Sequence, residues 1–315
     1  IDQTSLSAVS LAGQVQFVLS LFISGIAAGA GIMAAQYWGK QDAASIEKVI
    51  PIALRTNLLF SGLFTILAGF CPEMLMRIFT NDTALVASGS QYLRAVALSY
   101  VLCGISQVYL ILLKNTGHAA VSSRISSTAV VLNIILNAIL IYGLCGAPAL
   151  GIRGAAYATV AARVVELIWA YLETKKPERV RILWNRLFSS AGKILSEDFW
   201  RYTLPVLAAS LVWGIAYVLY SVIMGHMGSD AVAANSITSI AKSLLSCLIR
   251  GVSGGAGVLI GNLLGADELE KAREYGGRLT HLAIAIGVVT GGLLMLISPA
   301  IVHFAPLTDT AAEYL

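Results

Sequence analysis

The stretch Gly25-Ile-Ala-Ala-Gly29-Ala-Gly31-Ile-Met-Ala-Ala-Gln36-Tyr-Trp-Gly39 occurs twice in this chain. Its second copy lies 226 residues later and reads Gly251-Val-Ser-Gly-Gly255-Ala-Gly257-Val-Leu-Ile-Gly261-Asn262-Leu-Leu-Gly265. The likeness continues to the proline that closes the next apolar segment in each copy, Pro72 and Pro299. Self-similarity at a fixed offset indicates a duplicated structural unit. The sequence therefore predicts two halves that share one fold.

The composition is that of a membrane protein. Of the 315 residues, 57% are hydrophobic and 12% charged, and the mean hydropathy is +0.79. Soluble domains contain about 25% charged residues, and apolar runs of about 20 residues are long enough to cross a bilayer as helices. No alternating pattern of a membrane barrel is present. We predict an all-α polytopic membrane protein with spans near residues 11–36, 49–71, 93–113, 122–144, 153–173, 202–225, 232–262 and 278–304.

Lysine and arginine are distributed unevenly between the predicted loops. The loops after the first, third, fifth and seventh spans hold fourteen of these residues, and the alternate loops hold two, Arg77 and Arg153. Because basic loops remain in the cytoplasm, the first set is predicted to be cytoplasmic. Gly39 and Gly265 are expected to end the two glycine-rich helices at this side, since glycine commonly stops helices.

The repeat also predicts the domain organisation. It implies one helix before the first copy and three after the second, so we expect a piece of a twelve-helix protein that lacks its first helix and its last three. The copies are six crossings apart, which makes the two six-helix lobes a parallel repeat. We expect residues 1–173 to form helices 2–6 of the N-terminal lobe and residues 202–315 to form helices 7–9 of an incomplete C-terminal lobe.

Residues 174–201 are expected to join the lobes on the cytoplasmic side. Leu183, Leu187, Ala191 and Leu195 recur at helical spacing among basic residues. This pattern predicts an amphipathic helix on the inner leaflet. A solvated linker without regular structure is the alternative.

The glycines of the repeat have two interpretations. Small residues let helix backbones approach closely, which predicts tight packing. They also permit two halves to slide past each other during gating. Either interpretation involves Gly25, Gly29, Gly31, Gly251, Gly255, Gly257 and Gly261.

Polar residues inside the predicted spans are the candidates for a substrate or ion pathway. Asn133 and Asn137 lie four apart on one helical face, where amides bond neighbouring helices or offer oxygens to a cation such as Na⁺. Arg163 and Glu166 are three apart and so able to pair, and Glu166 is the only carboxylate well inside a predicted span. Charges in the membrane indicate function, although a structural ion pair is the alternative.

The second half holds further candidates. Lys242 and Arg250 lie within one predicted span, and we expect them to face a water-filled cavity or carboxylates on the helices that this piece is expected to lack. Trp213 and Tyr217, four apart, are candidates for an aromatic wall against a cationic substrate, with core packing as the alternative. No paired acidic motif, HExxH or GxSxG is found in the spans, so we expect neither an enzyme nor a cofactor.

In combination, these motifs resemble the multidrug and toxic compound extrusion (MATE) family of secondary antiporters. The resemblance covers essentially the whole chain and rests on Gly29-Ala-Gly31, Ala35-Gln36-Tyr-Trp-Gly39, Tyr92-Leu93-Arg94, Asn133-Ile-Ile-Leu-Asn137, Tyr142-Gly143, Pro148-Ala-Leu-Gly151-Ile-Arg-Gly154-Ala-Ala-Tyr-Ala-Thr159, Leu204-Pro205, Trp213, Ala233-Ala234-Asn235-Ser236-Ile237 and Gly261-Asn262-Leu-Leu-Gly265.

The resemblance implies two lobes around a central cavity that opens to each side in turn. It further implies a monomer in a bacterial plasma membrane that exports small organic compounds, usually cations, in exchange for Na⁺ or H⁺, with no nucleic-acid partner. Gln36, within the signature, joins the pathway candidates.

The chain departs from the family pattern at the expected coupling sites. The family often has a coupling carboxylate on its first helix, Asp at the position of Asn137, and Glu in the region of Ser210 and Trp213. Glu166 therefore becomes a candidate by elimination. Lys242 and Arg250 suit an anionic headgroup, which keeps a lipid-linked precursor or polysaccharide flippase of the same clan as the alternative function. An intramembrane enzyme is the third and least favoured alternative.

Overall fold

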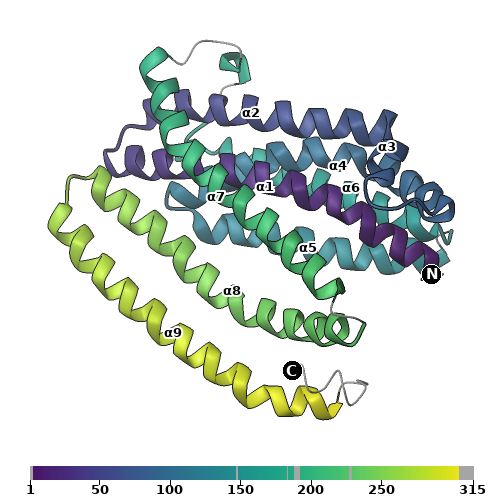
Figure 1. The fold of residues 1–315 in the computed structure, drawn as a ribbon. Helices are drawn as coiled ribbons and strands as arrows, with labels where there is room; N and C mark the ends of the chain where they lie inside the picture. Colours follow the sequence, from purple (N-terminus) through teal and green to yellow (C-terminus); the bar gives the residue numbers. More distant parts are fainter. Residues whose placement is uncertain (1–2, 147, 183, 188–191, 227–228, 305–315) are drawn as a thin grey trace. The chain divides into compact units, whose positions relative to one another are not determined.

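The computed structural model describes residues 3–146, 148–182, 184–187, 192–226 and 229–304. Side chains within the described helices that lie outside the description are those of residues 3–6, 145, 186, 221–222, 224–226, 229–238, 240–242 and 297–304. The described elements are α1 (Gln3–Gly39), α2 (Ala43–Phe70), α3 (Pro72–Arg77), α4 (Thr83–Asn115), α5 (Ala119–Tyr142), η1 (Leu144–Gly146), α6 (Gly151–Thr174), η2 (Trp184–Arg186), α7 (Lys193–His226), α8 (Ser229–Gly265) and α9 (Leu269–Phe304) (Figure 1).

Eight of these helices are long and apolar enough to cross a membrane. They correspond in order to the eight predicted spans, so the all-α polytopic prediction is confirmed. The short helix α3 follows Pro72, which occupies its first position. Proline is tolerated there because the first N–H of a helix has no intrahelical partner.

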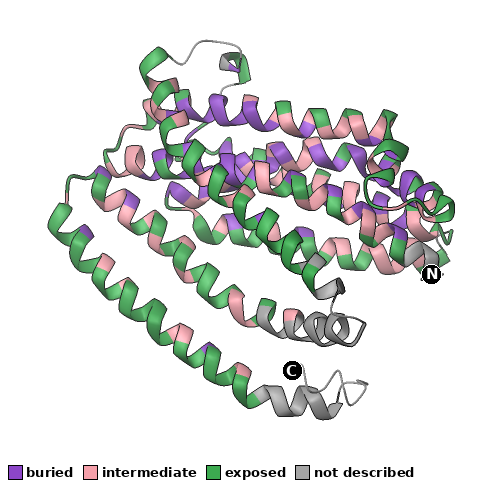
Figure 2. Ribbon diagram, viewed as in Figure 1, coloured by how far each residue is buried: buried purple, intermediate pink, exposed green. Residues whose placement is uncertain are grey.

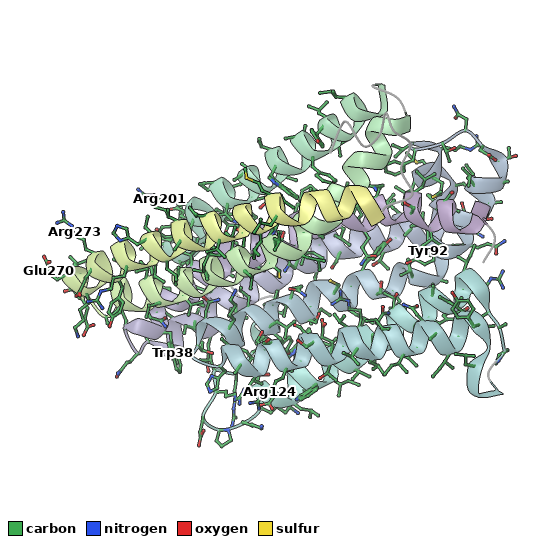
Figure 3. All side chains as sticks on the ribbon, turned by 90° about the horizontal axis from the view of Figure 1, so that it is seen from below. Trp38, Tyr92, Arg124, Arg201, Glu270 and Arg273 are labelled. Carbon is green, nitrogen blue, oxygen red and sulfur yellow. The ribbon has the colours of Figure 1, made fainter. Side chains whose placement is uncertain are left out.

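The chain divides into two compact units, residues 1–211 and residues 212–315. In the first unit α4 is the central helix and contacts α1, α2, α3, α5 and α6. Its tyrosines Tyr100 and Tyr109 are almost fully buried, and buried residues gather on α1, α2 and α4 (Figure 2). Trp38 and Arg124 lie toward one end of this unit and Tyr92 lies toward the other (Figure 3).

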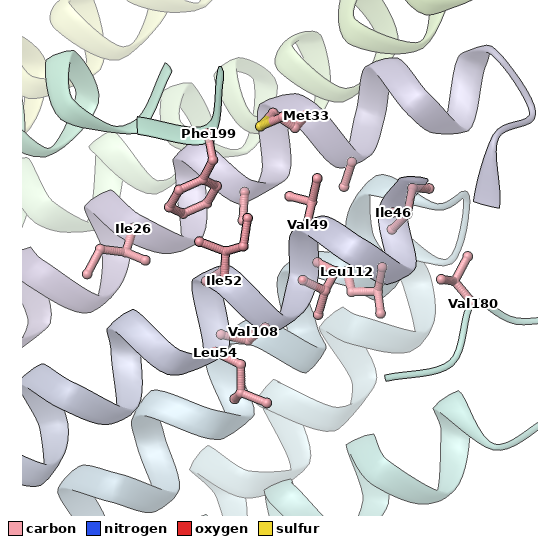
Figure 4. Packing of buried hydrophobic residues seen from close by; sticks show 14 of the residues in the cluster. Ile26, Met33, Ile46, Val49, Ile52, Leu54, Val108, Leu112, Val180 and Phe199 are labelled. Atoms are coloured by element: carbon pink, nitrogen blue, oxygen red, sulfur yellow. The ribbon is translucent and has the colours of Figure 1, made fainter. Parts of the chain in front are cut away.

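The largest apolar cluster of the first unit joins α1, α2 and α4 (Figure 4). Ile26 and Met33 of α1 meet Ile46, Val49 and Ile52 of α2, and Val108 and Leu112 of α4 close the cluster. Contacts of this kind stabilise helix association in a membrane through close packing, because lipid supplies no hydrophobic force between helices.

The segment between α6 and α7 packs onto the first unit. Val180 and Leu187 enter the α1–α2–α4 cluster, and the indole Nε1 of Trp184 donates a hydrogen bond of 2.8 Å to the hydroxyl of Tyr109. Among its described residues, Trp184–Arg186 form a 3-10 turn and Leu195 belongs to α7. Leu183 and Ala191 lie outside the described residues, so the amphipathic helix and the lobe boundaries at 173 and 202 stay predictions.

The duplication is visible in the backbone. Adding 226 to the bounds of α1 gives those of α8, and the same offset carries the start of α2 to the start of α9. Gln41 has a positive φ of 58° after α1, and its counterpart Asp267 has a positive φ of 61° after α8. Two separate units thus contain the same helix–turn–helix.

The hydrogen bonds of the two turns also correspond. The amide of Asp42 donates to the carbonyl of Tyr37 at 2.9 Å, and the amide of Glu268 donates to the carbonyl of Leu263 at 3.0 Å. This bond, together with the left-handed residue before it, defines a Schellman-type helix end. The prediction that α1 and α8 end at Gly39 and Gly265 is confirmed. The left-handed residue, however, is two positions later and is not glycine.

Asp42 begins α2 as its N-cap. Its carboxylate accepts hydrogen bonds from the amide of Ser45 at 3.0 Å and from the hydroxyl of Ser45 at 2.5 Å. These bonds satisfy one of the unpaired donors of the first helical turn. The hydrogen bonds from Ser45 also hold the pKa of the Asp42 carboxyl below its ordinary value.

We expect Asp42→Ala to lower the stability of the protein by about 1 kcal/mol at neutral pH because the cap is lost. A carboxyl group with a lowered pKa stabilises the folded state above its ordinary pKa of about 3.9 and loses this contribution as the pH falls. The difference in thermal unfolding between wild type and variant should therefore shrink below about pH 4. A difference that persists unchanged to pH 3 would contradict the capping role.

Candidate functional site

A charged cluster lies inside the first unit, where α4 meets α6. Nη1 of Arg163 lies 2.9 Å and 3.0 Å from the two carboxylate oxygens of Glu166. The hydroxyl of Ser106 on α4 donates to Oε1 of Glu166 at 2.5 Å. The Glu166 side chain is 2% exposed and that of Arg163 28% exposed. The predicted pairing of Arg163 with Glu166 is present, and the carboxylate is the more deeply buried partner.

The ion pair borders a pocket of about 270 Å³. The pocket is lined from three helices, by Gln16 of α1, by Ala129, Val130 and Asn133 of α5, and by Thr159, Ala162, Arg163 and Glu166 of α6. The structure thus brings three pathway candidates, Asn133, Arg163 and Glu166, to one place. Polar groups that converge on a concave site are typical of ligand binding.

The two asparagines of α5 are linked to each other. Nδ2 of Asn137 donates to Oδ1 of Asn133 at 3.1 Å, and Nδ2 of Asn133 lies 3.4 Å from the hydroxyl of Thr159 on α6. Oδ1 of Asn137 is buried and has no donor among the described residues. The contact of Asn133 with Thr159 represents the interhelical use of these amides. The use of an amide oxygen as a cation ligand stays a prediction.

Sequence reasoning missed four residues of the first unit. Ser106, Gln16 and Thr159 complete the pocket or its ion pair. Arg55 lies within the span of α2, is partly buried, and forms no hydrogen bond or ion pair among the described residues. A search for every charged residue within a span would have found Arg55. Thr159 ends one of the stretches on which the family resemblance rests but was not singled out as a site residue. Ser106 and Gln16 carry no signal of their own, because their role depends on contacts between helices.

The candidates of the second unit form an aromatic stack. The rings of Trp213 and Tyr217 lie 5.7 Å apart at 19°, and they are 50% and 47% exposed. Cζ of Arg250 lies 5.8 Å from the Trp213 ring, within the range of a cation–π contact. One face of the Trp213 ring, a candidate for binding a cationic substrate, is therefore already in contact with the guanidinium of Arg250. The side chain of Lys242 lies outside the described residues.

The glycines of the first copy mark close contacts. A Cβ atom on Gly29 would lie 2.8 Å from Cα of Thr203, and one on Gly25 would lie 2.9 Å from Cα of Leu207, both in α7. A Cβ on Gly31 would lie 2.9 Å from Nδ2 of Asn115 in α4. These contacts support the packing interpretation for the first copy. The gating interpretation stays a prediction.

The second copy differs in this respect. Around Gly251, Gly255 and Gly257 an added Cβ meets no described atom within 4 Å, and Gly261 is buried.

Gln36 is partly buried on α1 and is not among the residues that line the pocket. Within the described part of the chain, no three His, Cys, Asp or Glu side chains gather as ligands for a metal ion.

Eight apolar spans, a helix–turn–helix that occurs twice, and polar groups around a pocket among the spanning helices define a polytopic membrane protein of duplicated fold. The MatE family model matches residues 1–139 and 205–314. The chain belongs to the MATE family.

Individual relatives agree with this assignment. A protein named probable multidrug resistance protein NorM from Agrobacterium fabrum is 25% identical over 98% of this chain and 67% of its own length. The uncharacterized transporter YisQ of Bacillus subtilis is 21% identical over 94% of this chain and 65% of its own length. The chain thus spans about two thirds of the length of these relatives.

Solved structures share the fold. An outward-facing multidrug resistance MATE family transporter of the MOP superfamily superposes with a TM-score of 0.87 at 21% identity, over 99% of this chain and 69% of the other. A MOP superfamily transporter from Pyrococcus furiosus, described as having a binding pocket of reverse polarity, superposes with a TM-score of 0.86 at 22% identity, over 99% of this chain and 69% of the other.

Proposed function

We propose that the intact protein carrying this chain is a secondary active exporter that moves small organic compounds by alternating access of two lobes. The observation that carries this proposal is the repeated helix–turn–helix, which recurs in two separate compact units with the same bounds and turn hydrogen bonds. Parallel repeats of this kind place the substrate between two halves that rock against each other. Family membership supports the same activity.

Export is proposed to be coupled to Na⁺ or H⁺. Arg163 neutralises Glu166, and Ser106 occupies one of its oxygens, so this carboxylate is poorly placed to take up a further cation. Coupling is therefore proposed to use a carboxylate other than Glu166. The protein is proposed to act as a monomer in a bacterial plasma membrane, and the segment 174–201 is proposed to connect the lobes on the cytoplasmic side.

A lipid or polysaccharide flippase is the second candidate. The observation that favours it is the placement of arginines, since Arg163 lines the pocket and Arg250 is exposed in the second unit. An anionic headgroup suits guanidinium groups, which bind phosphate and carboxylate oxygens well.

The function is tested with the intact protein in proteoliposomes. Efflux of a cationic dye such as ethidium and of an acidic dye such as dansylglycine is followed under a Na⁺ gradient, a H⁺ gradient, or neither. We expect one gradient to drive efflux of at least one dye, and we expect Glu166→Gln to keep this gradient dependence. Absence of gradient-driven movement of either dye would contradict the exporter, and loss of coupling in Glu166→Gln would return the coupling site to Glu166.

A further inference from the structure

We infer that the pocket between α5 and α6 binds an anionic group of the transported compound, a carboxylate or a phosphate, through Arg163. The inference rests on the proposed function and adds the charge class of the substrate. It differs from the cationic substrate that the family resemblance implies.

The carboxylate of Glu166 is already hydrogen-bonded and is buried. It accepts two hydrogen bonds from Nη1 of Arg163 and one from Ser106, and 2% of its side chain is exposed. An organic cation entering the pocket would have to displace Arg163 to reach it. Desolvation without a free counter-charge is costly for such a ligand, so Glu166 forms a poor cation site.

Arg163 keeps donors for a ligand. Its side chain is 28% exposed and lines the pocket, and only Nη1 is hydrogen-bonded among the described residues. The edge formed by Nε and Nη2 presents two parallel N–H groups, the arrangement that binds carboxylate and phosphate in bidentate fashion. Because a ligand at this edge lies nearer to the guanidinium than to Glu166, the attraction exceeds the repulsion.

The remaining lining is compatible with an anion. Gln16 adds an amide that makes no hydrogen bond within the described part of the chain, and the other polar lining residues, Asn133 and Thr159, are uncharged. A volume of about 270 Å³ is below the usual size of a site for a drug-sized ligand. The pocket therefore accommodates one acidic end of a substrate and not the whole compound.

Two observations outside the pocket point the same way. In the second unit, Cζ of Arg250 lies 5.8 Å from the centroid of the Trp213 ring, so one face of this ring already has a cation of the protein beside it. In the first unit, Arg55 is a further cation within a span that lacks a described counter-charge. Each unit thus presents positive charge in its membrane-spanning helices.

The test is an equilibrium titration of the purified intact protein in detergent with two probes that share one fluorophore. Dansylglycine carries a carboxylate, and dansylaminoethyl-trimethylammonium carries a quaternary ammonium. We expect the carboxylate probe to bind at least about ten-fold more tightly. Tighter binding of the ammonium probe, weakened by Glu166→Gln, would overturn the inference.

Variants assign the binding to Arg163. The double variant Arg163→Gln/Glu166→Gln keeps the charge balance, and we expect it to weaken dansylglycine binding at least about ten-fold while changing ammonium binding less than two-fold. Glu166→Gln alone should strengthen dansylglycine binding a few-fold. Arg124→Gln is the control, since it removes an exposed cation of α5 outside the pocket lining, and should leave the affinity within two-fold. Unchanged affinity in a double variant that elutes as a single size-exclusion peak would overturn the inference.

A third probe separates two sources of the anion. Dansyl-phosphatidylethanolamine in mixed micelles carries a lipid phosphate. Arg163-dependent binding of soluble dansylglycine identifies a soluble organic acid as the ligand, and Arg163-dependent binding of the lipid probe alone identifies a headgroup. Because none of these titrations needs a gradient, failed transport with intact binding would remove the proposed exporter and leave the anion site standing.

Discussion

Arg163→Gln is expected to lower the stability of the intact protein by about 3 kcal/mol, because it leaves the carboxylate of Glu166 buried without its counter-charge. The Glu166 side chain is 2% exposed, and Ser106 would remain its only described hydrogen-bond donor. Breaking a buried pair by removing one partner typically costs about 3–5 kcal/mol. We expect a loss at the lower end of this range, because the Glu166 carboxyl group can take up a proton and remain hydrogen-bonded to Ser106.

The reverse substitution should cost less. Glu166→Gln leaves Arg163 charged, but this side chain is 28% exposed and borders the pocket, where water can solvate it. The double variant Arg163→Gln/Glu166→Gln leaves no buried charge and should recover most of the loss. The measurement is thermal unfolding in detergent of the three variants and wild type. If the single variant Arg163→Gln were as stable as the double variant, the carboxylate of Glu166 would not be destabilising without its counter-charge, and the prediction would be wrong.

The sequence predicted those features that depend on local spacing or on repetition. The offset of 226 anticipated that α8 would copy α1, and the spacing of Arg163 and Glu166 anticipated their ion pair. The pocket could not be predicted from spacing or repetition in the sequence. Its lining includes Gln16 of α1 alongside residues of α5 and α6, and helix contacts across more than a hundred residues of sequence depend on packing that no periodicity encodes.

The repeat also shows where identical sequence signals have different surroundings. Gly29 and Gly255 occupy equivalent positions in the two copies, yet a side chain on Gly29 would meet Thr203 and one on Gly255 meets no described atom. The motif specifies a helix face that permits close approach. Whether another helix lies against that face is decided by the rest of the fold.

The contact at Gly29 makes Gly29→Ala the second substitution with a large expected effect. The added Cβ would lie 2.8 Å from the backbone Cα of Thr203 and closer still to its side chain, and Thr203 is fully buried in α7. A rotamer change cannot relieve contact with a backbone atom, so the helices must move apart. Overpacking of this kind costs about 1–3 kcal/mol, and we expect about 3 kcal/mol here.

Gly13→Ala is the matched control for Gly29→Ala, because it makes the same substitution in α1 at a position where the added Cβ meets no described atom within 4 Å. Alanine has a higher helix propensity than glycine by about 0.8–1.0 kcal/mol, so this control should be neutral or stabilising. Thermal unfolding of both variants measures the difference. If Gly29→Ala were as stable as Gly13→Ala, the close approach of α1 and α7 would not exist in the folded protein, and the packing role of the glycine motif would be wrong.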